Sequence, residues 1–159
     1  MRTRGGRLGV LLLLFAALVV SACATMEPAP TLYQRLQVKD GTGTLRGGRD
    51  AIALIVDDFM ANAVADPRIA PRFTSLPAPK VAQLKSLLAD QLCEATGGPC
   101  AYYGREMKAT HQGMKISETE WNATVEALAK ALDKYRVDAK EKGEVLAALG
   151  PLKKDIVGQ

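Results

Sequence analysis

The chain of 159 residues has a single histidine, His111, and this scarcity excludes several kinds of site. One imidazole cannot build a paired-histidine metal centre, and no Ser–His–Asp arrangement with plausible partners is present. The sequence also lacks a CxxC motif and a phosphate-binding glycine loop, which argues against a redox dithiol and a nucleotide site. Any cofactor chemistry is therefore expected to centre on His111.

The chain also lacks an excess of charge once its first segment is set aside. Removing residues 1–22 takes away three arginines and no acidic residue, which leaves 18 Lys and Arg against 17 Asp and Glu. The sequence has no basic stripe, no ladder of aromatic residues and no glycine-rich arm. Nucleic acid is therefore not an expected partner.

The N-terminal residues have the pattern of a secretory signal. Three arginines precede an apolar run from Leu8 to Val20, which is shorter than the roughly 20 residues that span a bilayer. Small residues then precede Cys23, and this boundary resembles the bacterial lipobox. Residues 1–22 are predicted to be a lipoprotein signal peptide and Cys23 the lipidated residue; a plain signal peptide is the alternative. Ala24 resembles outer-membrane sorting, so we expect a lipid-anchored protein of the bacterial cell envelope, at the periplasmic face of the outer membrane.

The remaining residues show helical periodicity and predict an all-α domain. Residues 23–30 are a proline-bearing tether, residues 31–159 form one domain, and no strand alternation is found. Residues 37–48, rich in glycine and threonine, are expected to form a loop. Helices are expected over residues 50–65, 81–96, 117–135 and 139–157, with a kink at Pro151 and a short helix at His111.

Cys93 and Cys100 lie seven residues apart, on either side of a Gly-Gly-Pro turn. In an oxidising compartment such a pair can close a loop and tie the end of one helix to the segment that follows. A disulfide is one expectation, and two free thiols are the other.

The environment of His111 admits three interpretations. A neutral imidazole in an apolar crevice can bind haem iron, although an ordinary structural histidine has the same sequence pattern. Met107, His111 and Met114 follow the spacing i, i+4, i+7, and two thioethers with an imidazole would suit Cu(I), while methionines are more often core residues. The apolar residues available for a crevice are Phe59, Met60, Leu84, Leu88, Leu92, Ile116 and Leu128.

From Leu32 to Val157 the chain resembles the group 1 truncated haemoglobins, the two-over-two helical globins. The resemblance is carried, in order, by LYQRL, a Gly-Gly-x-x-Ala-Ile segment, VDDF with ADPR-x-x-x-x-F, ATGGPC-x-Y-x-G-x-x-MK-x-x-HQGM-x-I and LAALGPLKKDIV. It implies a truncated globin fold with helices B, E, G and H and a short proximal F helix. It also implies one haem b per chain, bound through His111, that takes up a diatomic gas (O2, NO or CO).

The same resemblance assigns roles to individual residues. Phe73 matches the phenylalanine that packs on the haem, and Lys108 is a candidate partner for a haem propionate. The residues matching positions on the proximal side are Tyr102, Met107 and Ile116.

The chain departs from this family where the gas would bind. Met60 replaces the frequent tyrosine, and Leu84 and Leu88 occupy positions where glutamine is common, so the distal pocket is expected to be apolar. Without a donor a hydrogen bond worth about 0.5–1.5 kcal/mol is lost, which predicts faster O2 loss and easier autoxidation. Gln91 could supply a donor, and Met60 as a sixth iron ligand is a further alternative.

The chain also departs from the group 1 truncated haemoglobins outside the haem site, in one inserted segment and in its expected location in the cell. Residues 37–46 are an insertion, and the expected lipid anchor argues against NO detoxification fed by a cytosolic reductase. The reductase is therefore unknown, and redox or NO dioxygenase-like activity stays open. The alternative function is a Met/His copper-binding or purely structural helical envelope lipoprotein.

Overall fold

A computed structural model of the chain describes residues 28–159. The predicted signal peptide, the lipidation site Cys23 and most of the tether lie outside the described residues. Within those residues no helix is long and apolar enough to cross a membrane.

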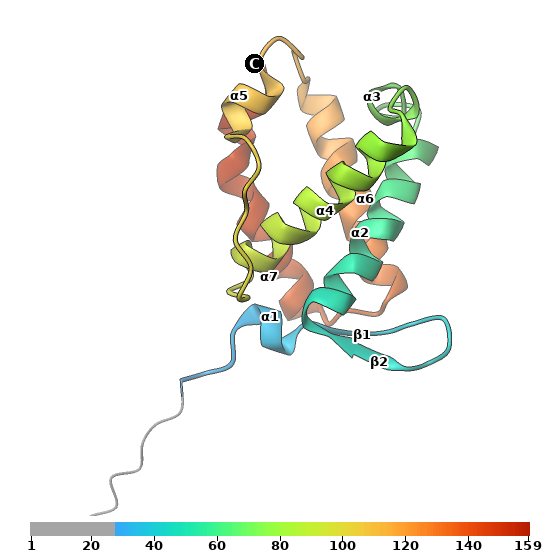
Figure 1. The fold of residues 1–159 in the computed structure, drawn as a ribbon, viewed down its shortest axis with the longest axis vertical. Coiled ribbons are helices and arrows are strands. Elements are labelled where there is room, and N and C mark those ends of the chain that lie inside the picture. Colours follow the sequence, from blue (N-terminus) through green and yellow to red (C-terminus); the bar gives the residue numbers. More distant parts are fainter. Residues whose placement is uncertain (1–27) are drawn as a thin grey trace, which may run out of the picture.

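The described part is mainly helical, as the sequence predicts. Helix α2 packs against both α4 and α6, while α5 and the chain end lie on the opposite side of the molecule (Figure 1). The helices are α1 (Leu32–Arg35), α2 (Gly48–Ala65), α3 (Pro71–Thr74), α4 (Ala78–Ala95), α5 (Met107–His111), α6 (Glu118–Lys134) and α7 (Ala139–Leu149), followed by the 3-10 helix η1 (Gly150–Asp155).

The packing of α2 on α6 follows from a stripe of small residues. Ala123, Ala127 and Ala131 of α6 are buried, and their short side chains let the apolar face of α2 approach closely. Asn62 of α2 donates its side-chain N–H to the backbone carbonyl of Ala127 at 3.0 Å, which fixes the register of the pair. The predicted capping box is present at the start of α6, where Ser117 and Glu120 satisfy each other's backbone N–H groups.

The expectation of a loop over residues 37–48, without strands, is wrong. Strands β1 (Gln37–Lys39) and β2 (Leu45–Gly47) form an antiparallel hairpin. The Asp40 carboxylate closes its turn by accepting hydrogen bonds from the backbone N–H groups of Thr42 and Thr44. Strands of three residues are too short to show alternation in the sequence.

Two helix boundaries also differ from the prediction. The helix α4 begins at Ala78 rather than at residue 81, because Pro79 falls in the first turn, where a missing N–H costs nothing. The predicted helix over residues 139–157 is not continuous: α7 ends at Leu149, and Pro151 lies in the tighter helix η1. Proline in a helix interior removes a hydrogen bond, which accounts for the change.

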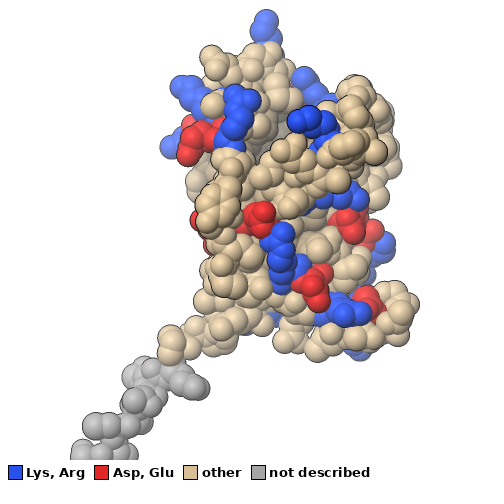
Figure 2. Space-filling view, viewed as in Figure 1, with Lys and Arg blue, Asp and Glu red and all other residues tan. Residues whose placement is uncertain are grey.

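Lys and Arg side chains are interspersed with Asp and Glu on the face shown in Figure 2. Several charged residues of the described part form pairs between elements. Arg49 of α2 pairs with Asp90 of α4, and Lys134 of α6 pairs with Asp58 of α2 at 2.6 Å. Exposed pairs of this kind contribute little stability, so apolar packing sets the arrangement of the helices.

Candidate functional site

A cavity of about 430 Å3 lies among the helices and contains the side chain of His111 in its wall. Its size is in the range of small-molecule and cofactor sites. Most of its lining is apolar, and the wall is contributed by α2, α4, α5, α6, α7 and η1 together with the corner around α3. Such a cavity excludes much of the water that would otherwise reach a bound group.

The His111 ring is oriented by its own helix. The ring nitrogen Nδ1 lies 2.8 Å from the backbone carbonyl oxygen of Met107. A carbonyl oxygen only accepts hydrogen bonds, so Nδ1 carries the proton and donates it. In the neutral imidazole, the second ring nitrogen, Nε2, then has the free electron pair, which is the form of histidine that binds a metal.

The cavity brings together most of the side chains predicted from the sequence. Phe59 enters from α2, and Phe73 from α3. The other predicted residues that line the cavity with His111 are Leu84, Leu88, Leu92, Met107, Ile116 and Leu128.

Three predicted residues lie outside the cavity lining. Met60 is only 3% exposed and packs in the hydrophobic core rather than in the cavity lining. The structure therefore does not support Met60 as a sixth iron ligand. The Tyr102 hydroxyl donates to the backbone carbonyl of Arg105 at 3.0 Å. Lys108 is exposed on α5, and its role toward a propionate stays a prediction.

The helical face proposed for copper does not exist. The helix α5 ends at His111, so Met107 and Met114 do not share a helical face, although both line the cavity with His111. Among residues 28–159 no group of three or more His, Cys, Asp or Glu side chains could hold a metal ion.

Two polar interactions interrupt the apolar wall. The Gln91 side chain on α4 donates to the Met107 sulfur on α5 at 3.5 Å, which is a weak bond because a thioether is a poor acceptor. Arg72 and Glu120 form an ion pair at 2.7 Å. Arg72, together with the backbone N–H and hydroxyl of Ser117, lowers the pKa of Glu120 to about 2, so this carboxylate is ionised at neutral pH.

Sequence reasoning gave several of the lining residues no role at the site. Trp121 and Val125 belong to the apolar stripe of α6, and that stripe is shared between the core and the cavity. Their helical periodicity was the available signal, but periodicity does not show which part of a face meets a cavity. The other lining residues without a predicted role are Val56, Ile69, Arg72, Leu76, Thr110, Glu120, Thr124, Leu149, Leu152 and Ile156.

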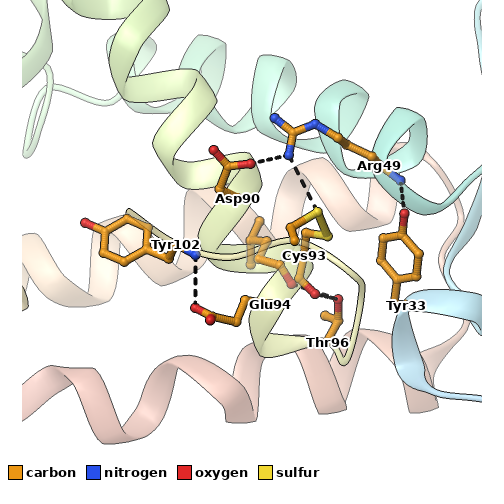
Figure 3. The surroundings of a disulfide bond; sticks show 9 residues. Tyr33, Arg49, Asp90, Cys93, Glu94, Thr96 and Tyr102 are labelled. Atoms are coloured by element: carbon orange, nitrogen blue, oxygen red, sulfur yellow. Dashed lines mark hydrogen bonds and ion pairs between the residues drawn. A yellow bond between two sulfur atoms is a disulfide. The ribbon is translucent and has the colours of Figure 1, made fainter. Parts of the chain in front are cut away.

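The segment leading to α5 is held by a disulfide. Cys93, fully buried near the end of α4, is bonded to Cys100, and the two Cα atoms are 5.7 Å apart (Figure 3). Around the bond, the Tyr33 hydroxyl accepts the backbone N–H of Arg49, and Glu94 accepts the backbone N–H of Tyr102. Gly98 is required here, since a Cβ would lie 2.6 Å from the Cys93 sulfur. The disulfide thus fixes where the chain leaves α4 on its way to His111.

Comparison with known proteins identifies the class of this fold and site. A profile of the bacterial-like globin family matches residues 45–157, and the chain belongs to that family. Globins bind haem and, through it, diatomic gases, so the chain is a member of a family of gas-binding haem proteins.

Within that class the similar proteins are truncated haemoglobins. A group 1 truncated haemoglobin of Mycolicibacterium paratuberculosis is 31% identical over 130 residues, which cover 82% of this chain and 85% of the relative. The structure of the Tetrahymena pyriformis truncated haemoglobin in its Fe(III) form superposes with a TM-score of 0.71 at 25% identity, covering 82% of this chain and 100% of the other. The 2/2 haemoglobin of a Synechococcus, in the cyanomet state with covalently attached haem, gives a TM-score of 0.68 at 25% identity, covering 80% and 98%. The two-over-two fold expected from the sequence is confirmed.

The residues of the cavity fit haem. The wall is apolar, as a porphyrin requires, and His111 presents the nitrogen Nε2 with its electron pair free. Phe73 and Met107 line the same cavity as His111 and supply flat and flexible apolar contacts for a macrocycle.

Proposed function

We propose that this protein binds one haem b through Nε2 of His111 and uses it to bind a diatomic gas, O2, NO or CO, reversibly. The observation that carries the proposal is the hydrogen bond from Nδ1 of His111 to the Met107 carbonyl oxygen, at 2.8 Å, in the wall of an apolar cavity. Haem, when bound, supplies an iron with one coordination position for the protein and one for the gas.

The chain's own residues would act in three ways. His111 donates its electron pair, and the Met107 carbonyl holds the ring in the required tautomer. Phe59, Phe73 and Leu128 line the cavity and exclude water. Leu84 and Leu88 line the α4 wall and offer no hydrogen-bond donor to a gas that carries partial negative charge.

Gln91 is the donor on α4 that faces this cavity. Its amide is held by the weak bond to the Met107 sulfur, so little free energy opposes its turning toward another acceptor. With the amide on Met107 the pocket favours CO over O2 more strongly than a pocket with a tyrosine donor, because O2 gains more from a donor.

The experiment is gas binding by the haem-loaded protein. Haemin is added to one equivalent, the iron is reduced, and the Soret band is followed as CO, NO or O2 is introduced. We expect saturable, reversible spectral shifts at one gas molecule per chain. A loaded protein whose spectrum responds to none of the three gases would contradict the proposal.

We also propose that the protein is anchored to a bacterial envelope membrane by lipid on Cys23 and faces the periplasm. This rests on the arginines, short apolar run and small residues before Cys23. The test is metabolic labelling with a fatty acid in cells expressing the full chain or Cys23→Ser. Label in the membrane fraction of the wild type alone would support anchoring, whereas an unlabelled wild-type chain would overturn it.

A further inference from the structure

The short helix that carries His111 has little to stabilise it internally. The helix α5 has five residues, from Met107 to His111, and its N-cap residue Glu106 makes no side-chain capping bond. Isolated helices this short do not persist in water, so the position of α5 must be imposed by neighbouring segments.

Upstream, the segment before α5 fastens the helix. The Thr110 backbone N–H donates to the Glu106 carbonyl, and its hydroxyl donates to the Arg105 carbonyl. Arg105 in turn donates its guanidinium to the Ala109 carbonyl at 2.6 Å. These bonds hold the start of α5 but leave the residues after His111 to be held by something else.

The residues that follow His111 are held by backbone contacts with residues 157–159. Ile116 and Val157 pair as a parallel β-bridge, the Gly158 N–H donates to the Ile116 carbonyl at 2.9 Å, and the Lys115 N–H donates to a backbone oxygen of Gln159. Figure 1 shows the C-terminus beside α5. The segment that follows the candidate iron ligand is therefore tied to residues 157–159, which we call the C-terminal latch.

The backbone of Lys115 shows that this tie imposes a conformation. Its φ is 51°, in the left-handed region that residues with a side chain rarely adopt. Such a conformation persists only where surrounding contacts enforce it, and the bond to Gln159 is a contact at that residue. Gly158, with φ 77°, supplies the matching left-handed turn on the other strand.

The latch also touches the cavity through its neighbours. Ile116 and Ile156, which lie in or next to the paired segments, both line the cavity, and η1 packs against α5. A displacement of residues 157–159 would therefore move both the wall and the turn that follows His111.

We infer that residues 157–159 are positioning residues for His111: the latch fixes the orientation of the imidazole and so controls how firmly the haem is held. The haem part of this inference rests on the proposed function. The latch itself concerns backbone hydrogen bonds that exist without haem.

The first test is hydrogen exchange in the haem-free full chain. The Lys115 and Gly158 amides should exchange more slowly than in an unstructured peptide, and by similar factors, because both open when the latch opens. Exchange of the Lys115 amide at the peptide rate would overturn the latch, whether or not the protein binds haem. This separates failure of the latch from failure of the proposed function.

The second test uses variants of the haem-loaded chain. Gly158→Pro removes the N–H donor and forbids the left-handed φ, and a chain ending at Val157 removes both latch bonds. Gln159→Ala is the control, because it deletes only the side-chain bond to the Lys154 carbonyl and keeps the backbone.

Haem transfer to an excess of an acceptor globin should be about tenfold faster than in the control for the chain ending at Val157, which loses two backbone bonds. It should be several-fold faster for Gly158→Pro, which loses the Gly158 bond directly. The iron–histidine stretching band in the ferrous resonance Raman spectrum should broaden, because His111 samples more orientations. General unfolding could not give a broadened band together with unchanged helicity. Wild-type transfer rates together with an unchanged band in both variants would refute the inference.

Discussion

The Nδ1 atom of His111 and the carbonyl oxygen of Met107 lie 2.8 Å apart, one helical turn from each other on α5. This relationship decides which nitrogen of the only histidine is available for a metal.

Introducing a donor on the α4 wall should slow O2 release. Leu88→Gln places an amide where the cavity now has an alkyl group, and a hydrogen bond of about 1 kcal/mol slows dissociation several-fold. Stopped-flow O2 dissociation measures the effect, with CO dissociation as the reference. Leu87→Gln is the matched control, because the same change is made on the same helix outside the cavity lining. Equal O2 dissociation rates in Leu88→Gln and Leu87→Gln would contradict the placement of Leu88 in the wall that faces the gas.

Met60→Leu should leave the visible spectrum unchanged in both iron oxidation states. Met60 lies in the hydrophobic core rather than in the cavity lining, so its sulfur is not placed to bind iron. The swap nearly conserves volume, and unfolding by urea should show a loss of less than about 1.5 kcal/mol. Loss of a six-coordinate spectral component in the variant would show that Met60 reaches the iron.

Reducing the disulfide should destabilise the protein. Cys93 and Cys100 close a short loop, seven residues apart in sequence, and the chain-entropy argument gives about 2–3 kcal/mol for a loop of that size. The double variant Cys93→Ala/Cys100→Ala should unfold at lower urea concentration by a matching amount. The same variant with reductant serves as the control, since it has no disulfide left to reduce. A midpoint equal to that of the oxidised wild type would disprove a stabilising role.

The Arg72–Glu120 pair should make stability depend on pH in the acidic range. The pKa of Glu120 is lowered from 4.5 to about 2 in the folded protein, so its contribution is complete above pH 4.5 and is lost as the pH falls toward 2. Glu120→Gln keeps the capping box but removes the charge, and should cost about 1 kcal/mol at neutral pH.

Urea unfolding from pH 7 down to pH 3 measures this dependence. The difference in unfolding free energy between wild type and Glu120→Gln should shrink steadily below pH 4.5. Glu118→Gln is the control, because Glu118 lies in the same helical turn but is exposed and pairs with Lys153 at the surface. A difference that stays constant over the whole range would mean that Glu120 does not hold a lowered pKa.

The sequence predicted the helical frame because long apolar stripes leave little choice of fold. The apolar stripe from Ile52 to Ala63 and the Ser117–Glu120 capping box could be predicted from the sequence alone, and the structure has both at the predicted positions. The hairpin around Asp40 was missed, because its turn depends on side-chain hydrogen bonds within three-residue strands.

The site was predictable to a similar extent. The residues resembling truncated globins placed Phe73, Leu84 and Leu88 around one cavity. Pairing of Ile116 with Val157 joins segments 41 residues apart in sequence, and nothing local to either segment indicates it. Met60 shows the opposite limit: a family position gives a location on a helix, but packing decides whether the side chain turns to the cavity or to the core.

The central claim is that His111 binds haem iron through Nε2, and titration of the protein with haemin tests it most directly. The wild type should give a Soret band that saturates at one haem per chain, and His111→Ala should lose or shift that band. Added imidazole should restore the band in the variant, since it supplies the missing nitrogen. A His111→Ala protein with the wild-type spectrum, or a wild type that takes up no haem, would contradict the account, and titration with Cu(I) would follow.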